Sequence, residues 1–124
     1  MSAITRHGTH PRLPVSNAVE ANGWLYVTGQ VPRDENGELL AGNMTAQARL
    51  TLNNLVKVVT ESGYEMKDVV RVGVWIDDPR DFADFNKVFA EFFDIEHAPA
   101  RVTVQGSMVC DCKIEIDAIA YKES

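Results

Sequence analysis

Short stretches in which apolar and polar residues alternate predict β-strands with one buried face. Residues 17–21 and 24–29 flank Asn22-Gly23, a pair that favours the tight turn of a β-hairpin. A third strand is expected over residues 69–76, with an apolar face formed by Val70, Val72, Val74 and Ile76. This part of the chain therefore predicts one hairpin and one further strand.

The C-terminal part predicts two more strands, at residues 100–105 and 113–121. The second has one apolar face that consists of Ile114, Ile116, Ala118 and Ala120. We expect these two strands to pair as a hairpin around residues 106–112.

Two stretches with apolar residues three or four positions apart predict helices. The first covers residues 45–62, with Asn43 as its N-cap and Gly63 as its C-terminal stop. The second starts with Asp78 as the cap and Pro79 at the first helical position. Its buried stripe is expected to consist of Phe82, Phe85, Phe89 and Phe92.

The order of these elements predicts an α+β sandwich that forms one domain over residues 1–124. In it, one mixed sheet carries both helices on one face. The opposite face would expose large apolar side chains among polar ones, namely Trp24, Tyr26, Trp75, Ile119 and Tyr121. Because a monomer rarely leaves so much aromatic surface in water, we expect other copies of the chain to cover it in a closed ring.

Composition narrows the possible functions. The 124-residue chain has 12 basic and 18 acidic residues, which gives a net charge of −6 and argues against a general nucleic-acid binder. No apolar run approaches the roughly 20 residues that cross a bilayer, and residues 1–14 lack the apolar core of a secretory signal. The only two cysteines, Cys110 and Cys112, are interpreted as reduced thiols, which predicts a cytoplasmic protein.

Arg101 is the strongest candidate for a functional residue. It begins a strand, is expected to face away from the helices, and could present its planar guanidinium to a carboxylate. The alternative is a cross-strand ion pair, because a terminal hairpin would place Asp117 roughly opposite and Glu115 one step along. Glu115 could instead position or deprotonate a water molecule.

Other reactive side chains give weaker signals. His97 precedes Arg101 in a loop and could act as a base, although surface histidines are common there. His7 and His10 have no evident third ligand, and the Cys-x-Cys spacing does not fit a structural metal site. We therefore expect no metal site.

Several segments together resemble one family. Residues 99–104 (Pro-Ala-Arg-Val-Thr-Val) and 113–120 (Lys-Ile-Glu-Ile-Asp-Ala-Ile-Ala) closely resemble the signature of the Rid family, also called YjgF/YER057c/UK114. Residues 26–32 are similar to its S/T-G-Q-x-P segment and residues 81–86 to its D-F-x-x-x-N segment. The resemblance extends over nearly all of residues 15–122.

This resemblance implies a chorismate-mutase-like fold and a homotrimer with sites in clefts between subunits. It implies cofactor-free hydrolysis of 2-imino or enamine acids to 2-keto acids and ammonia. By position, Arg101 would bind the substrate carboxylate and Glu115 would lie near the attacking water. Gly29 would contact the substrate through its backbone, Asn86 would line the cleft, and Thr103 could hydrogen-bond the substrate or the water.

The chain also departs from the pattern of active family members. Val15 stands where they commonly have tyrosine, and Thr103 stands where they often have cysteine. The alternative function is therefore a non-catalytic trimer that binds small carboxylates or 2-keto acids as a sensor or pathway partner. RNA cleavage, ascribed to some relatives, is disfavoured by the acidic charge.

Overall fold

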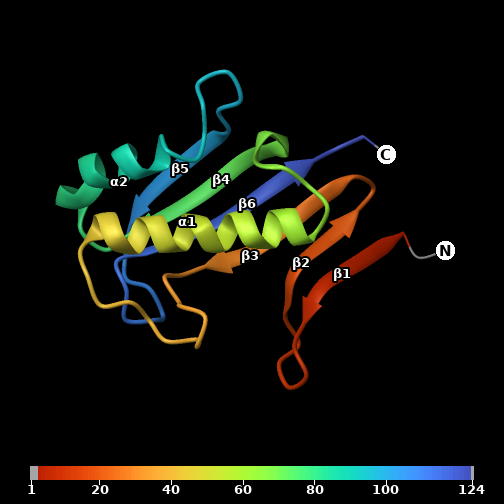
Figure 1. Ribbon diagram of the computed structural model, residues 1–124, viewed down its shortest axis with the longest axis horizontal. Coiled ribbons are helices and arrows are strands. Elements are labelled where there is room, and N and C mark those ends of the chain that lie inside the picture. The colour runs from red at the N-terminus through yellow and green to blue at the C-terminus, as the bar shows by residue number, and fades with distance from the viewer. Residues whose placement is uncertain (1–2, 124) are drawn as a thin grey trace.

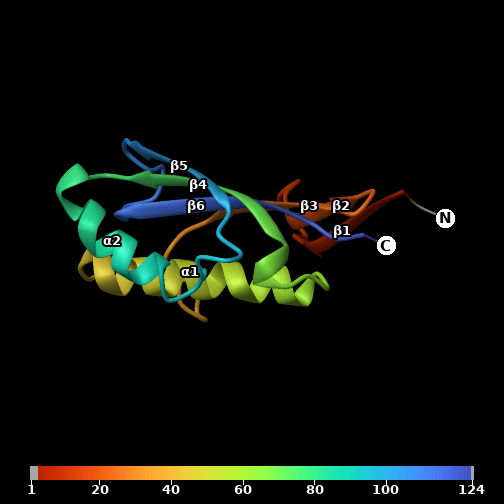
Figure 2. The same ribbon diagram turned by 90° about the horizontal axis from the view of Figure 1, so that it is seen from above.

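The computed structural model describes residues 3–123. Six strands form one mixed sheet in the order β1-β2-β3-β6-β4-β5. Helices α1 and α2 lie together on one face of this sheet, as predicted (Figures 1 and 2). The strands are β1 (Ile4–Thr9), β2 (Ser16–Ala21), β3 (Trp24–Gln30), β4 (Val69–Ile76), β5 (Ala100–Gln105) and β6 (Ile114–Tyr121). The helices are α1 (Met44–Glu61) and α2 (Phe82–Phe89), with short 3₁₀ turns at Met66–Asp68 and Pro79–Asp81.

The predicted β2–β3 hairpin is confirmed. Asn22 and Gly23 both have positive φ, at 56° and 86°, as a two-residue turn of the hairpin type requires. Ala21 therefore pairs with Trp24, and this register puts Leu25 and Val27 on the buried face.

The prediction of a C-terminal hairpin is wrong. Strand β5 pairs in parallel with β4, while β6 lies between β3 and β4 and is antiparallel to both. The segment β4-α2-β5 is thus a parallel crossover, which needs its helix to bring the chain back to the same end of the sheet. Asp117 consequently lies opposite Gly73 and forms an ion pair with Arg71 at 3.8 Å, not with Arg101.

A register shift changes the expected face of β4. Its pairing with β6 is irregular between Val69 and Arg71, so Val69 is buried and Val70 is 42% exposed. Val70 therefore does not belong to the apolar face. The remaining predicted positions, Val72, Val74 and Ile76, are buried against the helices.

Helix α1 matches its prediction to within one residue at each end. The Asn43 side chain accepts a hydrogen bond from the Ala46 backbone N–H at 3.0 Å, and Gly63 follows the helix with a φ of +88°. Its apolar stripe is completely buried over the sheet and includes Ala48, Leu52, Leu55 and Val59.

The second helix differs from its prediction in where it begins and in what it buries. Asp78 accepts a hydrogen bond from the Arg80 N–H at 2.9 Å, but Pro79 starts a 3₁₀ turn and the α-helix begins at Phe82. Phe85 is fully buried, whereas Phe82 is 41% exposed. Because α2 lies near the β5 edge of the sheet, only its inner side is covered (Figure 2).

Strand β1 was not predicted. It pairs with β2 at the sheet edge, and nearly all of its residues are exposed, so it has no apolar alternation to recognise. The open face of the sheet, by contrast, is as expected: Trp24, Tyr26, Trp75 and Tyr121 are 37–49% exposed on it. That other copies of the chain cover this face stays a prediction.

Candidate functional site

Arg101 lies on the helix-covered face of the sheet, beneath α2, and not on the open face as expected. The parallel pairing of β4 with β5 sets Arg101 beside Val72, which is fully buried against the helices. Side chains alternate along a strand, so Val102 and Val104 point to the open face and are 50% and 45% exposed.

The Arg101 guanidinium is surrounded by aromatic rings. Its central carbon lies 5.6 Å from the ring centre of Phe82, 5.2 Å from that of Phe85 and 4.8 Å from that of Phe89. At such distances the ring faces attract a cation. One terminal nitrogen of the guanidinium donates a hydrogen bond to Asn86 Oδ1 at 2.9 Å.

No carboxylate within the described residues neutralises this charge. Within residues 3–123, Arg101 forms no ion pair, and its hydrogen-bond partner is a neutral amide. Burial lowers the pKa of the guanidinium from its ordinary value, although arginine keeps its proton at neutral pH. The remaining N–H groups form a partly desolvated fork, a geometry suited to two parallel hydrogen bonds with an organic carboxylate.

Thr103 is the next residue of β5 on the same face as Arg101. With Phe82 it lines a recess of about 270 Å³ between β5 and the beginning of α2. The fold therefore brings together three of the predicted site residues: Arg101, Asn86 and Thr103.

Glu115 and Gly29 meet on the opposite face of the sheet. Glu115 pairs with Trp75 in the β4–β6 register, and Gly29 lies at the irregularity between β3 and β6. A Cβ at position 29 would collide with Glu115 Oε2 and lie 3.2 Å from its carboxyl carbon. Glycine therefore leaves the space that the Glu115 carboxylate fills.

Within one chain these two groups of residues are kept apart. Arg101 is on β5 and on the helix side, whereas Glu115 is on β6 and on the open side, with β4 between them. Two strand spacings already amount to roughly 10 Å. Arg101 and Glu115 of one chain are therefore separated both along the sheet and by its two faces.

Two of the remaining reactive residues, His97 and His7, each contact a carboxylate of their own. His97 Nδ1 lies 3.0 Å from Asp94 in an exposed loop, and His7 is 3.0 Å from Glu20. No three potential metal ligands gather anywhere in residues 3–123. Cys110 and Cys112 are free thiols.

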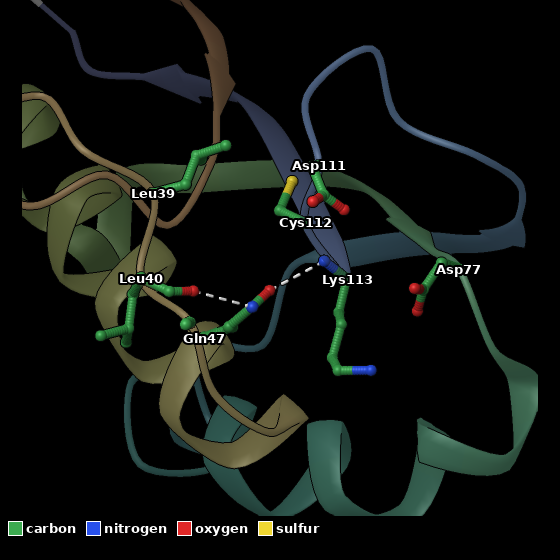
Figure 3. A pocket seen from close by; sticks show the side chains of 8 residues that line it. Leu39, Leu40, Gln47, Asp77, Asp111, Cys112 and Lys113 are labelled. Carbon is green, nitrogen blue, oxygen red and sulfur yellow. Dashed lines mark hydrogen bonds between the residues drawn. The ribbon is translucent and has the colours of Figure 1, made fainter.

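A second pocket, of about 310 Å³, lies beside the N-terminal end of α1 (Figure 3). Gln47 connects its walls, because its amide donates to the Leu40 carbonyl at 2.9 Å and accepts from the Lys113 N–H at 2.8 Å. Asp77 and Lys113 also line it. In the sequence, the only sign of this pocket is Gln47, a polar residue among the buried positions of α1.

The aromatic cage around Arg101 also was not predicted as part of a site. Phenylalanines at helical spacing predict a core, and Phe85 does belong to it. The spacing of these phenylalanines does not indicate that their rings contact the Arg101 guanidinium. This contact depends on the β4-α2-β5 crossover, which places β5 beneath α2.

Comparison with known proteins supports the resemblance. The sequence model described as Endoribonuclease L-PSP matches residues 5–122. A RutC family protein of Pyrococcus horikoshii is 41% identical over 122 residues, which cover 97% of this chain and 96% of the relative. An Escherichia coli protein named "Putative reactive intermediate deaminase TdcF" is 35% identical, over 90% of this chain and 88% of that protein.

Solved structures agree with the fold. A crystal structure of a Thermotoga maritima protein described as a "putative endoribonuclease" has a TM-score of 0.89 at 33% identity, covering 97% of this chain and 99% of that one. The crystal structure of yeast Mmf1 has a TM-score of 0.86 at 28% identity with the same coverage. No helix within residues 3–123 is long and apolar enough to span a membrane.

Proposed function

Because the chain belongs to the Endoribonuclease L-PSP family, also known as YjgF/RutC or Rid, we propose that it hydrolyses reactive 2-imino and enamine acids. The products would be 2-keto acids and ammonia, and the role would be to remove damaging metabolites. The proposal places the protein in the cytoplasm, where its two thiols stay reduced. It requires neither a metal nor an organic cofactor.

The observation that carries this proposal is the unneutralised charge of Arg101. A half-buried cation held by Phe82, Phe85, Phe89 and the Asn86 amide has no carboxylate partner within residues 3–123. A purely structural arginine would normally be paired when it is taken out of water. An anionic ligand would complete this environment, and 2-imino acids carry a carboxylate next to the reacting carbon.

The proposed reaction needs only a modest rate enhancement from the protein. Arg101 binds the carboxylate through two parallel hydrogen bonds and thereby fixes the orientation of the adjacent C=N carbon. Imines hydrolyse unaided, so a hundredfold acceleration requires a barrier lower by only about 2.7 kcal/mol. Positioning of the substrate and of one water molecule suffices for a gain of that size.

Glu115 supplies the second group. Its carboxylate accepts a hydrogen bond from a water molecule and orients the water oxygen toward the C=N carbon. Addition of this water gives a carbinolamine. The amine then takes up a proton, and ammonia leaves as the C=O bond forms. The Gly29 backbone, beside Glu115, contacts the substrate in this arrangement.

The two groups act together only across a subunit boundary. Arg101, Asn86 and Thr103 of one protomer would face Glu115 and Gly29 of the next protomer in a homotrimer. Two features support this arrangement: the separation of Arg101 from Glu115 within one chain, and the exposed aromatic side chains on the face that carries Glu115.

The direct test couples an amino acid oxidase to the protein and follows the disappearance of the imine. We expect faster loss of the imine than in buffer. Absence of acceleration for imines with several different side chains would reject the deaminase.

Experiments can also distinguish two other functions. Val15 and Thr103 depart from the pattern of active members, so tight binding of a 2-keto acid without turnover would favour the sensor or pathway-partner function. The family description names an endoribonuclease, but the net charge of −6 opposes binding to RNA, and we propose no nucleic-acid partner.

A further inference from the structure

We propose that the recess beside Arg101 selects substrates with an uncharged, apolar side chain. This inference rests on the proposed function, because it concerns the same carboxylate-binding site. Six residues line the recess: Ile76, Pro79, Phe82, Thr103, Val104 and Gln105. Its volume of about 270 Å³ is just below the range of roughly 300–1,000 Å³ that holds drug-sized ligands, so it suits a smaller molecule.

The recess adjoins the guanidinium. Phe82 is shared, since its ring centre lies 5.6 Å from the Arg101 guanidinium carbon and its side chain also forms a wall of the recess. Thr103 follows Arg101 by two residues on the same strand face, which corresponds to about 6.6 Å along β5. A molecule whose carboxylate binds Arg101 can therefore direct its side chain toward Thr103.

The lining contains no charged side chain. The side chains of Ile76, Pro79 and Phe82 are apolar, and the Gln105 amide donates to the Asp77 carbonyl at 3.2 Å. The Thr103 hydroxyl has no hydrogen-bond partner within residues 3–123. A second carboxylate or an ammonium placed here would lose its hydration without gaining a partner, whereas an aliphatic side chain would gain from burial.

Calorimetry with three 2-keto acids tests this inference without depending on turnover. Pyruvate has only a methyl group, 4-methyl-2-oxopentanoate has an isobutyl group, and 2-oxoglutarate has a second carboxylate. We expect the isobutyl compound to bind about tenfold more tightly than pyruvate, or better, because its added carbons are buried. 2-Oxoglutarate should bind at least tenfold more weakly than the isobutyl compound.

Two variants at Thr103, one that fills the recess and one that does not, provide the matched comparison. Thr103→Leu should reduce the preference for the isobutyl compound to less than about threefold while pyruvate still binds, because leucine occupies the space. Thr103→Val keeps the shape of the side chain and should keep the preference. Circular dichroism and thermal unfolding would show that both variants are folded.

The outcomes separate this inference from the function on which it rests. Equal affinity for all three acids, or tighter binding of 2-oxoglutarate, would overturn the selectivity even if imines are hydrolysed. The expected order of affinities without hydrolysis would keep the selectivity and reject the deaminase. If none of the three acids binds, both the selectivity and the carboxylate-binding function are rejected.

Discussion

Arg101 combines two properties that rarely occur together: partial burial and the absence of a carboxylate partner within residues 3–123. Its removal therefore tests the substrate-binding role. Arg101→Ala should lower kcat/KM for imine hydrolysis on the order of 10²–10⁴-fold, because two charge-assisted hydrogen bonds are lost. Arg101→Lys should recover only part of this loss, since an ammonium cannot reproduce the planar fork.

The matched control is Arg49, an exposed arginine on α1 that is paired with Glu91 at 2.7 Å. Arg49→Ala should leave kcat/KM within about twofold, as expected for the loss of an exposed ion pair. An Arg101→Ala enzyme with unchanged kcat/KM would show that the guanidinium does not hold the substrate.

Gly29 is the residue that makes room for Glu115. Gly29→Ala would place a methyl group against Glu115 Oε2. It would displace the carboxylate that, in the proposed mechanism, orients the water. We expect kcat to fall roughly 10- to 100-fold, since small misplacements of catalytic groups have effects of this size. Gly106→Ala is the control, because a Cβ at that position meets no atom within 4 Å. Equal activities of the two variants would contradict the role of Gly29.

The cysteines should differ in reactivity. Burial raises the pKa of the Cys112 thiol, which donates to the Ile114 carbonyl at 3.4 Å and is 8% exposed. Because the thiolate is the reactive form, Cys112 should resist iodoacetamide at neutral pH until the protein unfolds. Peptide mass analysis should find Cys110, which is less buried, alkylated first. Simultaneous labelling of both thiols in the native protein would contradict this.

Among the elements, α2 has one buried face and one partly exposed face. Phe85 is fully buried and packs on Phe89 at a centroid distance of 5.5 Å, whereas Phe82 is 41% exposed. Phe85→Ala should lower the free energy of unfolding by about 3–5 kcal/mol, as for other buried aromatic truncations. Phe82→Ala should lower it much less, and denaturant unfolding of both variants would compare them. Equal losses would show that Phe82 also supports the core.

The sequence allowed most elements to be predicted, because their signals are local. The Asn22-Gly23 turn and the Asn43 cap follow from residues close together in the chain. Strand order does not, because β5 and β6 are consecutive in sequence yet separated by β4. Expecting a hairpin there gave Arg101 the wrong partner, Asp117. The apolar alternation of Val102 and Val104 put Arg101 on the wrong face, because these valines are exposed on the open side.

At the scale of the whole molecule, the candidate site residues could be named from family resemblance, but their arrangement could not. Asn86 and Thr103 lie beside Arg101 because the β4-α2-β5 crossover brings them together. Glu115 lies on the other side of the sheet, and no local pattern in the sequence gives that separation. This separation is the reason for proposing a site that a second copy of the chain completes.

Co-expression of two inactive variants tests this shared site most directly. Arg101→Ala protomers retain Glu115, and Glu115→Gln protomers retain Arg101. If each site takes one residue from each of two neighbours, random mixing in a trimer should restore about a quarter of the sites, and thus about a quarter of wild-type imine hydrolysis. Mixtures no more active than either variant alone would contradict a site shared between subunits.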